Sequence, residues 1–129
     1  MKILKAIFWM FAVIVLPTEE CCDSAVQVQV GGIMRVTAYC PCEKCCGRWA
    51  NGITASGHRI QKNARFVAAP KNILFGAKFI VPGYNNSKPV PVLDRGGAIN
   101  GNMLDVFFDS HQEALNWGVQ YLKVEKFKN

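Results

Sequence analysis

The chain has 129 residues and a mass of 14.3 kDa, a typical size for one domain built around one hydrophobic core. Of these residues 50% are apolar and 19% are charged, so the composition excludes both a disordered chain and a fibrous repeat. Lys and Arg number 15 against 9 Asp and Glu, which gives a net charge of +6. This charge favours an anionic partner, but it does not distinguish nucleic acid from a membrane surface or a cell wall.

The N-terminus has the pattern of a secretory signal peptide. Lys2 and Lys5 precede an uninterrupted apolar run over residues 6–16, which is shorter than the roughly 20 residues of a membrane span. We therefore expect a signal peptide over residues 1–20, with cleavage as late as residue 25 and an uncleaved membrane anchor as the alternative. Its removal takes away two lysines and two glutamates and leaves the charge at +6. The sequence thus predicts a secreted or envelope-associated protein whose partner is an anionic polymer outside the membrane and not nucleic acid.

The remainder, residues 33–129, has the alternating apolar pattern of short β-strands. Clusters of Gly, Asn and Pro separate the apolar segments and indicate turns. One short helix is expected after Ser110, because Ser110 and Glu113 have the spacing of a capping box and Gly118 offers a left-handed stop. The pattern predicts a mainly β protein, a small closed or nearly closed barrel, with strands over residues 34–40, 66–69, 78–81, 90–94, 104–108 and 121–127.

A cysteine cluster follows the first expected strand and consists of Cys40, Cys42, Cys45 and Cys46. A catalytic thiol is the least favoured role, because only His58 and His111 could serve as its base. Structural zinc sites usually draw their cysteines from two separated pairs, and exported chains meet an oxidising compartment in many hosts. We therefore expect at least one disulfide in the cluster, of undetermined pairing, with a zinc site as the alternative. Apart from that alternative, no metal and no other cofactor is expected.

Carboxylates are scarce, since none occurs between Lys44 and Leu93. Among those present, Asp105 stands out because it shares a strand face with Met103 and Phe107. Apolar neighbours desolvate a carboxylate, raise its pKa and keep it protonated, which is the state that a general acid requires. Asp105 is therefore the first candidate for acid and base catalysis.

A second candidate, Asp94, ends the preceding strand. Three glycines lie between the two aspartates, at Gly96, Gly97 and Gly101. Because glycine has no β-carbon, this turn would let a substrate approach the backbone closely.

Four segments of the chain resemble the 3D domain family, which is named for its three aspartates. They are VTAY at residues 36–39, GITASG at 52–57, ILFGAK at 73–78 and, above all, DRGGAINGNMLDVFFDS at 94–110. The same spacing of two aspartates around the glycines occurs in the catalytic domain of MltA-type lytic transglycosylases. The resemblance implies a double-psi β-barrel of about six or seven strands, with one or two short helices, that acts on peptidoglycan glycan strands.

Residue by residue, the resemblance implies that Asp105 is the catalytic acid and base and that Asp94 is paired with it in the groove. The expected substrate-binding residues are Tyr39, Thr54, Ser56, Gly57, Lys78, Gly96 and Gly97. The chain departs from the family at Ala69, where an aspartate usually precedes the proline, and at Leu74, where a proline is usual.

The expected reaction is lytic transglycosylation of the bond between N-acetylmuramic acid (MurNAc) and N-acetylglucosamine (GlcNAc), with formation of 1,6-anhydroMurNAc. One carboxyl group suffices, because no water has to be activated by a second base. Trp49 would either stack on a sugar ring or fill the barrel as a plug. The alternatives are a cell-wall-binding barrel without activity, a glycoside hydrolase that uses Asp94 as base, and a cysteine-cluster metal protein.

Overall fold

The structure is a computed structural model that describes residues 32–128. The expected signal peptide over residues 1–20 lies outside the described residues. Within residues 32–128, no helix is long and apolar enough to cross a membrane.

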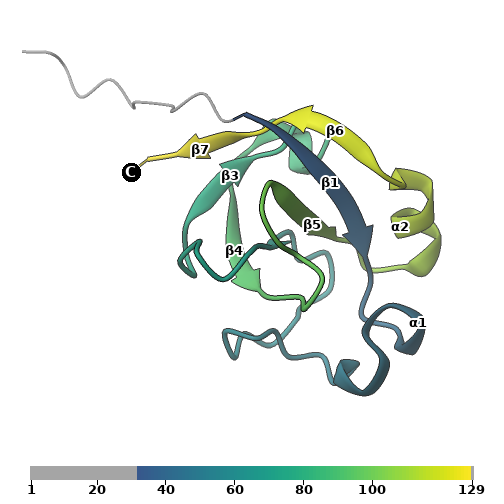
Figure 1. The fold of residues 1–129 in the computed structure, drawn as a ribbon. Coiled ribbons are helices and arrows are strands. Elements are labelled where there is room, and N and C mark those ends of the chain that lie inside the picture. Colours follow the sequence, from purple (N-terminus) through teal and green to yellow (C-terminus); the bar gives the residue numbers. More distant parts are fainter. Residues whose placement is uncertain (1–31, 129) are drawn as a thin grey trace, which may run out of the picture.

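Seven strands form one sheet in the order β6-β1-β5-β2-β4-β3-β7. The two edge strands, β6 and β7, are consecutive in the chain and are joined through the fully buried Val124. The sheet therefore curls into a nearly closed barrel (Figure 1). The strands are β1 (Ile33–Tyr39), β2 (Val67–Ala68), β3 (Lys78–Ile80), β4 (Val90–Asp94), β5 (Met103–Phe107), β6 (Gln120–Lys123) and β7 (Glu125–Phe127). The mainly β barrel is confirmed, and the last expected strand is divided in two at Val124.

The barrel interior is filled by the alternate side chains of these strands. Val36, Leu104 and Val106 are fully buried from β1 and β5, and Val67 and Val92 meet them from β2 and β4. Apolar burial of this kind contributes about 25 cal/mol for each Å² removed from water. The opposite faces of the same strands are left for the site.

Two α-helices lie outside the barrel, α1 (Glu43–Cys46) and α2 (His111–Trp117). Half of the capping box predicted for α2 is present, because the Ser110 hydroxyl accepts a hydrogen bond from the Glu113 backbone N–H at 3.2 Å. The Glu113 carboxylate accepts from the Ser110 hydroxyl at 3.0 Å, where a full capping box would have it accept from the Ser110 backbone N–H. Gly118 ends the helix with a φ of 65°. The indole of Trp117 donates to the Val36 carbonyl at 3.3 Å, which ties α2 to β1.

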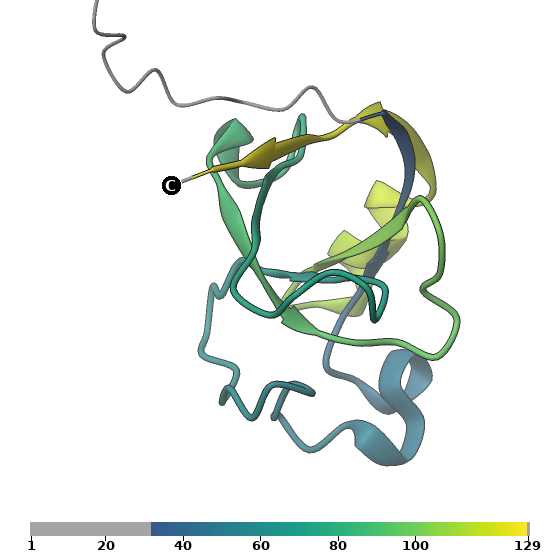
Figure 2. The same ribbon diagram turned by 60° about the vertical axis from the view of Figure 1, so that its left-hand side comes forward.

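The segment between β1 and β2 runs outside the barrel, below β4 and β5 in the views of Figures 1 and 2. It contains α1 and the 3₁₀ turn η1 (Gly47–Trp49); a second 3₁₀ turn, η2 (Asn85–Ser87), precedes β4. This outer segment supplies one wall of the groove described next.

Candidate active-site groove

Four residues on adjacent strands form one row across the outer face of the sheet. Thr37 of β1 pairs with Asp105 of β5, and Asp105 pairs with Ala68 of β2. Ala68 in turn pairs with Asp94 of β4. Since side chains of paired residues point to the same face of a sheet, the row brings both aspartates to one surface.

A β-bulge in β4 places Asp94 in this row. Val67 pairs with Val92 while the next residue, Ala68, pairs with Asp94, so Leu93 is the extra residue. In a regular strand Asp94 would share the core-facing side of Val92. The bulge instead turns the carboxylate outward, as bulges near active sites commonly do.

Asp105 is half-buried in this row. Burial of the carboxyl group raises its pKa from 3.8 to about 6, and the nearby charge of Asp94 acts in the same direction. The Thr37 hydroxyl opposes this shift by donating to Asp105 Oδ1 at 3.0 Å. The apolar environment expected for Asp105 therefore has the expected effect on its pKa.

Asp94 uses both carboxylate oxygens as hydrogen-bond acceptors. Oδ2 accepts from the Tyr39 hydroxyl at 2.6 Å. Oδ1 accepts from the backbone N–H groups of Ala55 at 2.8 Å and Arg95 at 2.9 Å. Burial and the adjacent Asp94 raise the pKa of Tyr39 far above its usual range, so the phenol remains a donor. Asp94 thus holds both Tyr39 at the end of β1 and Ala55 in the outer segment.

The two aspartates face a groove of about 560 Å³, within the range of small-molecule sites. Of the residues expected at the cleft, Tyr39, Thr54, Gly96 and Gly97 line it together with Asp94 and Asp105. Its other walls come from the outer segment, β2 and the start of the glycine turn, namely Pro41, Cys45, Cys46, Trp49, Ala50, Asn51, Gly52, Ile53, Ala55, Ile60, Ala68 and Arg95.

Three residues expected at the cleft lie outside its lining. The Ser56 hydroxyl contacts the Thr54 hydroxyl at 3.0 Å, and the Gly57 N–H donates to the Thr54 carbonyl at 2.9 Å. These two residues therefore shape the loop that presents Thr54. Lys78 lies in β3, where it pairs with Pro91 and Phe127.

The two glycines after Arg95 differ in their surroundings. A β-carbon at Gly96 would lie 2.8 Å from Cγ1 of Ile99, so this position requires glycine for packing. A β-carbon at Gly97 would have no heavy atom within 4 Å. Gly97 is therefore the glycine that leaves open space at the groove.

Trp49 lies at the groove with 68% of its surface exposed. This exposure excludes the alternative of a plug inside the barrel. The Arg48 guanidinium lies 4.9 Å from the centre of the Trp49 ring. One indole face is thus covered by a cation while the side chain remains available to a ligand.

Sequence reasoning missed two polar groups that organise the site. The Thr37 hydroxyl donates a hydrogen bond to Asp105. The only feature of the sequence that could have indicated this role is the position of Thr37 between core residues of β1. The Arg95 guanidinium donates to the carbonyls of Ala69 and Ile73, so it holds the loop after β2. Ala69 itself is fully buried and its side chain packs in the core, on the face opposite the groove.

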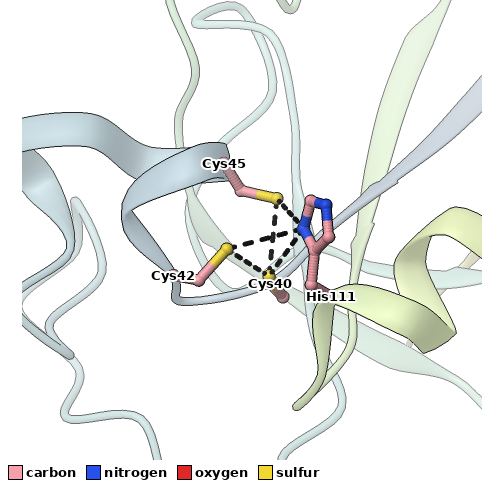
Figure 3. A group of neighbouring side chains, drawn as sticks. All are labelled: Cys40, Cys42, Cys45 and His111. Carbon is pink, nitrogen blue, oxygen red and sulfur yellow. Dashed lines mark hydrogen bonds between the residues drawn. The ribbon is translucent and has the colours of Figure 1, made fainter.

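The disulfide prediction is wrong for the described residues, in which Cys40, Cys42, Cys45 and Cys46 are all free thiols. The Cys40 sulfur lies 2.9 Å from that of Cys42 and 3.4 Å from that of Cys45, whereas a disulfide bond is about 2.05 Å long. Cys46 points elsewhere and contacts the Cys40 carbonyl at 3.2 Å. Three of the sulfurs are arranged around Nδ1 of a fourth side chain, His111, and not around one another as a bonded pair (Figure 3).

Two curated proteins and one family model are similar to this chain. The cell wall-binding protein YocH of Bacillus subtilis (strain 168) is 40% identical over 78 residues, which cover 58% of this chain and 26% of that protein. The putative cell wall shaping protein YabE of the same organism is 34% identical over 99 residues, which cover 74% of this chain and 23% of that protein. The chain thus spans about a quarter of the length of these curated relatives. Residues 65–128, which contain both aspartates and the glycine turn between them, match the 3D domain, and the chain therefore belongs to the 3D domain family.

Proposed function

We propose that the protein is a cell-envelope lytic transglycosylase that cleaves the MurNAc–GlcNAc bond of peptidoglycan and forms 1,6-anhydroMurNAc. The observation that carries the proposal is the half-buried Asp105 carboxyl, whose pKa is raised to about 6 at a groove that it shares with Asp94. A carboxyl group with this pKa exists in both protonation states near neutral pH, as a residue that first donates and then accepts a proton must.

The reaction needs one proton carrier and consumes no water. The Asp105 carboxylic acid donates its proton to the glycosidic oxygen as the bond from that oxygen to C1 of MurNAc breaks. The C6 hydroxyl of the same sugar then attacks C1, and its proton passes to the Asp105 carboxylate. Asp105 ends in its starting state, and the products are a GlcNAc end and a 1,6-anhydro ring.

The surroundings of Asp105 suit this sequence of steps. The Thr37 hydroxyl orients Oδ1 at 3.0 Å, which leaves the second oxygen for the substrate. Asp94 holds the Tyr39 hydroxyl and the Ala55 backbone in place across the groove, and so acts on the groove's shape. Trp49 offers an exposed aromatic face at the same groove, on which a sugar ring could stack.

The proposal of a cell-wall substrate draws on charge and on the relatives. The net charge of +6 favours association with an anionic polymer. One relative carries the name of a cell wall-binding protein and another that of a putative cell wall shaping protein. We propose that the cell wall is also the substrate of this chain and that the protein is therefore located in the cell envelope.

Incubation of the purified protein with peptidoglycan sacculi tests the proposal. The wild-type protein should release soluble muropeptides, and Asp105→Asn should release none while still sedimenting with sacculi. Asp109→Asn is the matched control, because Asp109 accepts a hydrogen bond from the Asn63 backbone at 2.8 Å and does not line the groove. Loss of muropeptide release in Asp109→Asn but not in Asp105→Asn would contradict the assignment of Asp105 as the catalytic acid.

A cell-wall-binding barrel without activity is the second candidate. It is favoured by the buried Ala69, which stands where the resemblance to the 3D domain family implies an aspartate, and by the binding function in the name of YocH. Such a protein would sediment with sacculi and release no fragments. Binding that is equal in the wild type and Asp105→Asn, with no release by either, would establish this alternative.

The hydrolase alternative has less support. A hydrolase of this kind needs a second carboxylate to activate water. Asp94 is occupied by the Tyr39 hydroxyl and by two backbone N–H groups. These contacts suit a structural acceptor better than a base that must take a proton from water.

A further inference from the structure

We propose that Cys40, Cys42, Cys45 and His111 bind one zinc ion in a tetrahedral Cys₃His site. The proposal is independent of the catalytic activity proposed above. It rests on the convergence of four ligand atoms, which all lie within 4.8 Å of one another. Figure 3 shows the three thiols of the loop after β1 and the imidazole of α2 pointing toward one another.

The position of the imidazole nitrogen is the strongest evidence. Nδ1 of His111 lies 3.6 Å from the sulfur of Cys40, 3.5 Å from that of Cys42 and 3.4 Å from that of Cys45. Zn–S and Zn–N bonds of about 2.3 and 2.0–2.1 Å at tetrahedral angles place sulfur and nitrogen about 3.5 Å apart. The three observed distances therefore agree with ligands around one small central ion.

The sulfur–sulfur distances exclude a disulfide and are somewhat shorter than those of a zinc site. Tetrahedral zinc separates two thiolate sulfurs by about 3.8 Å. Cys40 is 2.9 Å from Cys42 and 3.4 Å from Cys45, which is too long for a disulfide bond of about 2.05 Å. The cluster is thus somewhat contracted relative to a zinc site, and a modest outward rotation of the thiols would accommodate the ion.

The donor set selects the metal and its role. Thiolate sulfur with imidazole nitrogen in a tetrahedron is typical of zinc, and four protein ligands leave no open position for substrate or water. Binding transfers the thiol protons to solvent as the three Zn–S bonds form. The site is therefore structural.

The part of the outer segment that carries α1 and η1 needs such a support, because it buries little apolar surface. Neither α1 nor η1 contains a buried residue, and order in a short loop without burial has a large entropic cost. A zinc ion would join this segment to the first turn of α2, across 66–71 positions of sequence. Since Cys45 and Trp49 line the groove, the ion would hold one groove wall in position.

Metal analysis of the full protein, purified with reductant and without chelators, tests the proposal. Mass spectrometry of the metal content should give one zinc per chain. Cys42→Ser and His111→Ala should bind less than a tenth of the wild-type amount. His111→Cys should retain zinc, because it restores a fourth ligand and shows that any loss in His111→Ala is not a failure to fold.

Two variants serve as matched controls, one at a cysteine beside the cluster and one at a histidine outside it. Cys46→Ser should keep its zinc, because Cys46 contacts the Cys40 carbonyl instead of the cluster. His58→Ala should also keep it, because His58 is exposed and belongs to no cluster of metal-ligating side chains found in residues 32–128. As a second readout, addition of EDTA should lower the Tm of the wild type and leave that of His111→Ala unchanged.

Three results would overturn the proposal. The first is a protein that binds no metal when zinc is supplied and retains reactive thiols at Cys40, Cys42 and Cys45. The second is a disulfide within the cluster that forms in preference to zinc binding. The third is zinc loss in Cys46→Ser as large as in Cys42→Ser, because the ligand set would then differ. Sacculus digestion is not used in any of these assays, so a failure of the proposed activity does not affect the outcome.

Discussion

Asp94 and Asp105 are both register partners of Ala68, one on each side of β2. Two strand spacings of about 4.8 Å therefore separate their backbones, and the small alanine leaves the space between the carboxylates open to the groove. Their environments differ: Asp94 accepts three hydrogen bonds, whereas the described contacts of Asp105 include a single side-chain donor, Thr37. This asymmetry is the basis for assigning proton transfer to Asp105 and positioning to Asp94.

Asp94→Asn should lower activity about 10- to 100-fold, because an amide replaces one acceptor oxygen and loosens the loop that carries Ala55. The core lies on the opposite face of the sheet, so the Tm should fall by only a few degrees, on the order of the effect of one lost hydrogen bond. Tyr39→Phe removes the 2.6 Å bond alone and should have a smaller effect on activity. Turnover measured beside thermal unfolding separates the two roles. An Asp94→Asn protein that unfolds much earlier yet retains full activity below its transition would show that Asp94 only holds the turn.

Activity should depend on pH through the protonation of Asp105. With a pKa of about 6, the acid form falls to roughly a tenth by pH 7 and decreases about tenfold for each further pH unit. We expect kcat/KM to decline with this slope above pH 6. A profile that stays flat from pH 5 to 9 would exclude Asp105 as the acid.

The same pKa has a consequence for stability. The folded pKa of about 6 lies above the ordinary value of 3.8, so protonation of Asp105 favours the folded state. This contribution is complete below about pH 4 and is lost as the pH rises through 6. Asp105→Asn carries no charge, so at pH 7 its free energy of unfolding should exceed that of the wild type by about 1–2 kcal/mol, after allowance for partial exposure. Urea unfolding at pH 7 and pH 4 checks this, and a difference that is the same at both pH values would mean that titration is not its cause.

Trp49→Ala should weaken binding to glycan strands by about five- to tenfold, an effect of roughly 1 kcal/mol that is typical of aromatic stacking. Its side chain is 68% exposed, so stability should change little. Tyr121→Ala is the matched control, because Tyr121 is 69% exposed and lies outside the groove lining. Equal binding losses in the two variants, measured by sedimentation with sacculi, would remove Trp49 from the binding site.

Much of the barrel could be predicted from the sequence because its information is local. Strand alternation gave the strand regions, and the spacing of Ser110 and Glu113 gave the start of α2. The raised pKa of Asp105 followed from its apolar neighbours on β5. These features depend on the two-residue repeat of β-strands and on a capping pattern formed by neighbouring residues, both of which can be read from a short stretch of sequence.

The remaining features depend on contacts between distant segments. The approach of His111 to the cysteine loop spans about 70 positions, and no local pattern indicates it. The bulge at Leu93 arises from pairing with β2 and has no signature in the strand itself. The expected disulfide failed for this reason, because the cluster was considered without the imidazole that the fold brings to it.

Analysis of the new glycan ends tests the central claim most directly. Fragments released from sacculi are treated with borohydride and examined by mass spectrometry, in parallel for the wild type and Asp105→Asn. A lytic transglycosylase that uses Asp105 leaves 1,6-anhydroMurNAc, which borohydride does not reduce, and the variant leaves no new ends. Reducible MurNAc or GlcNAc ends from the wild type, or anhydro ends produced by Asp105→Asn at the wild-type rate, would contradict the assignment.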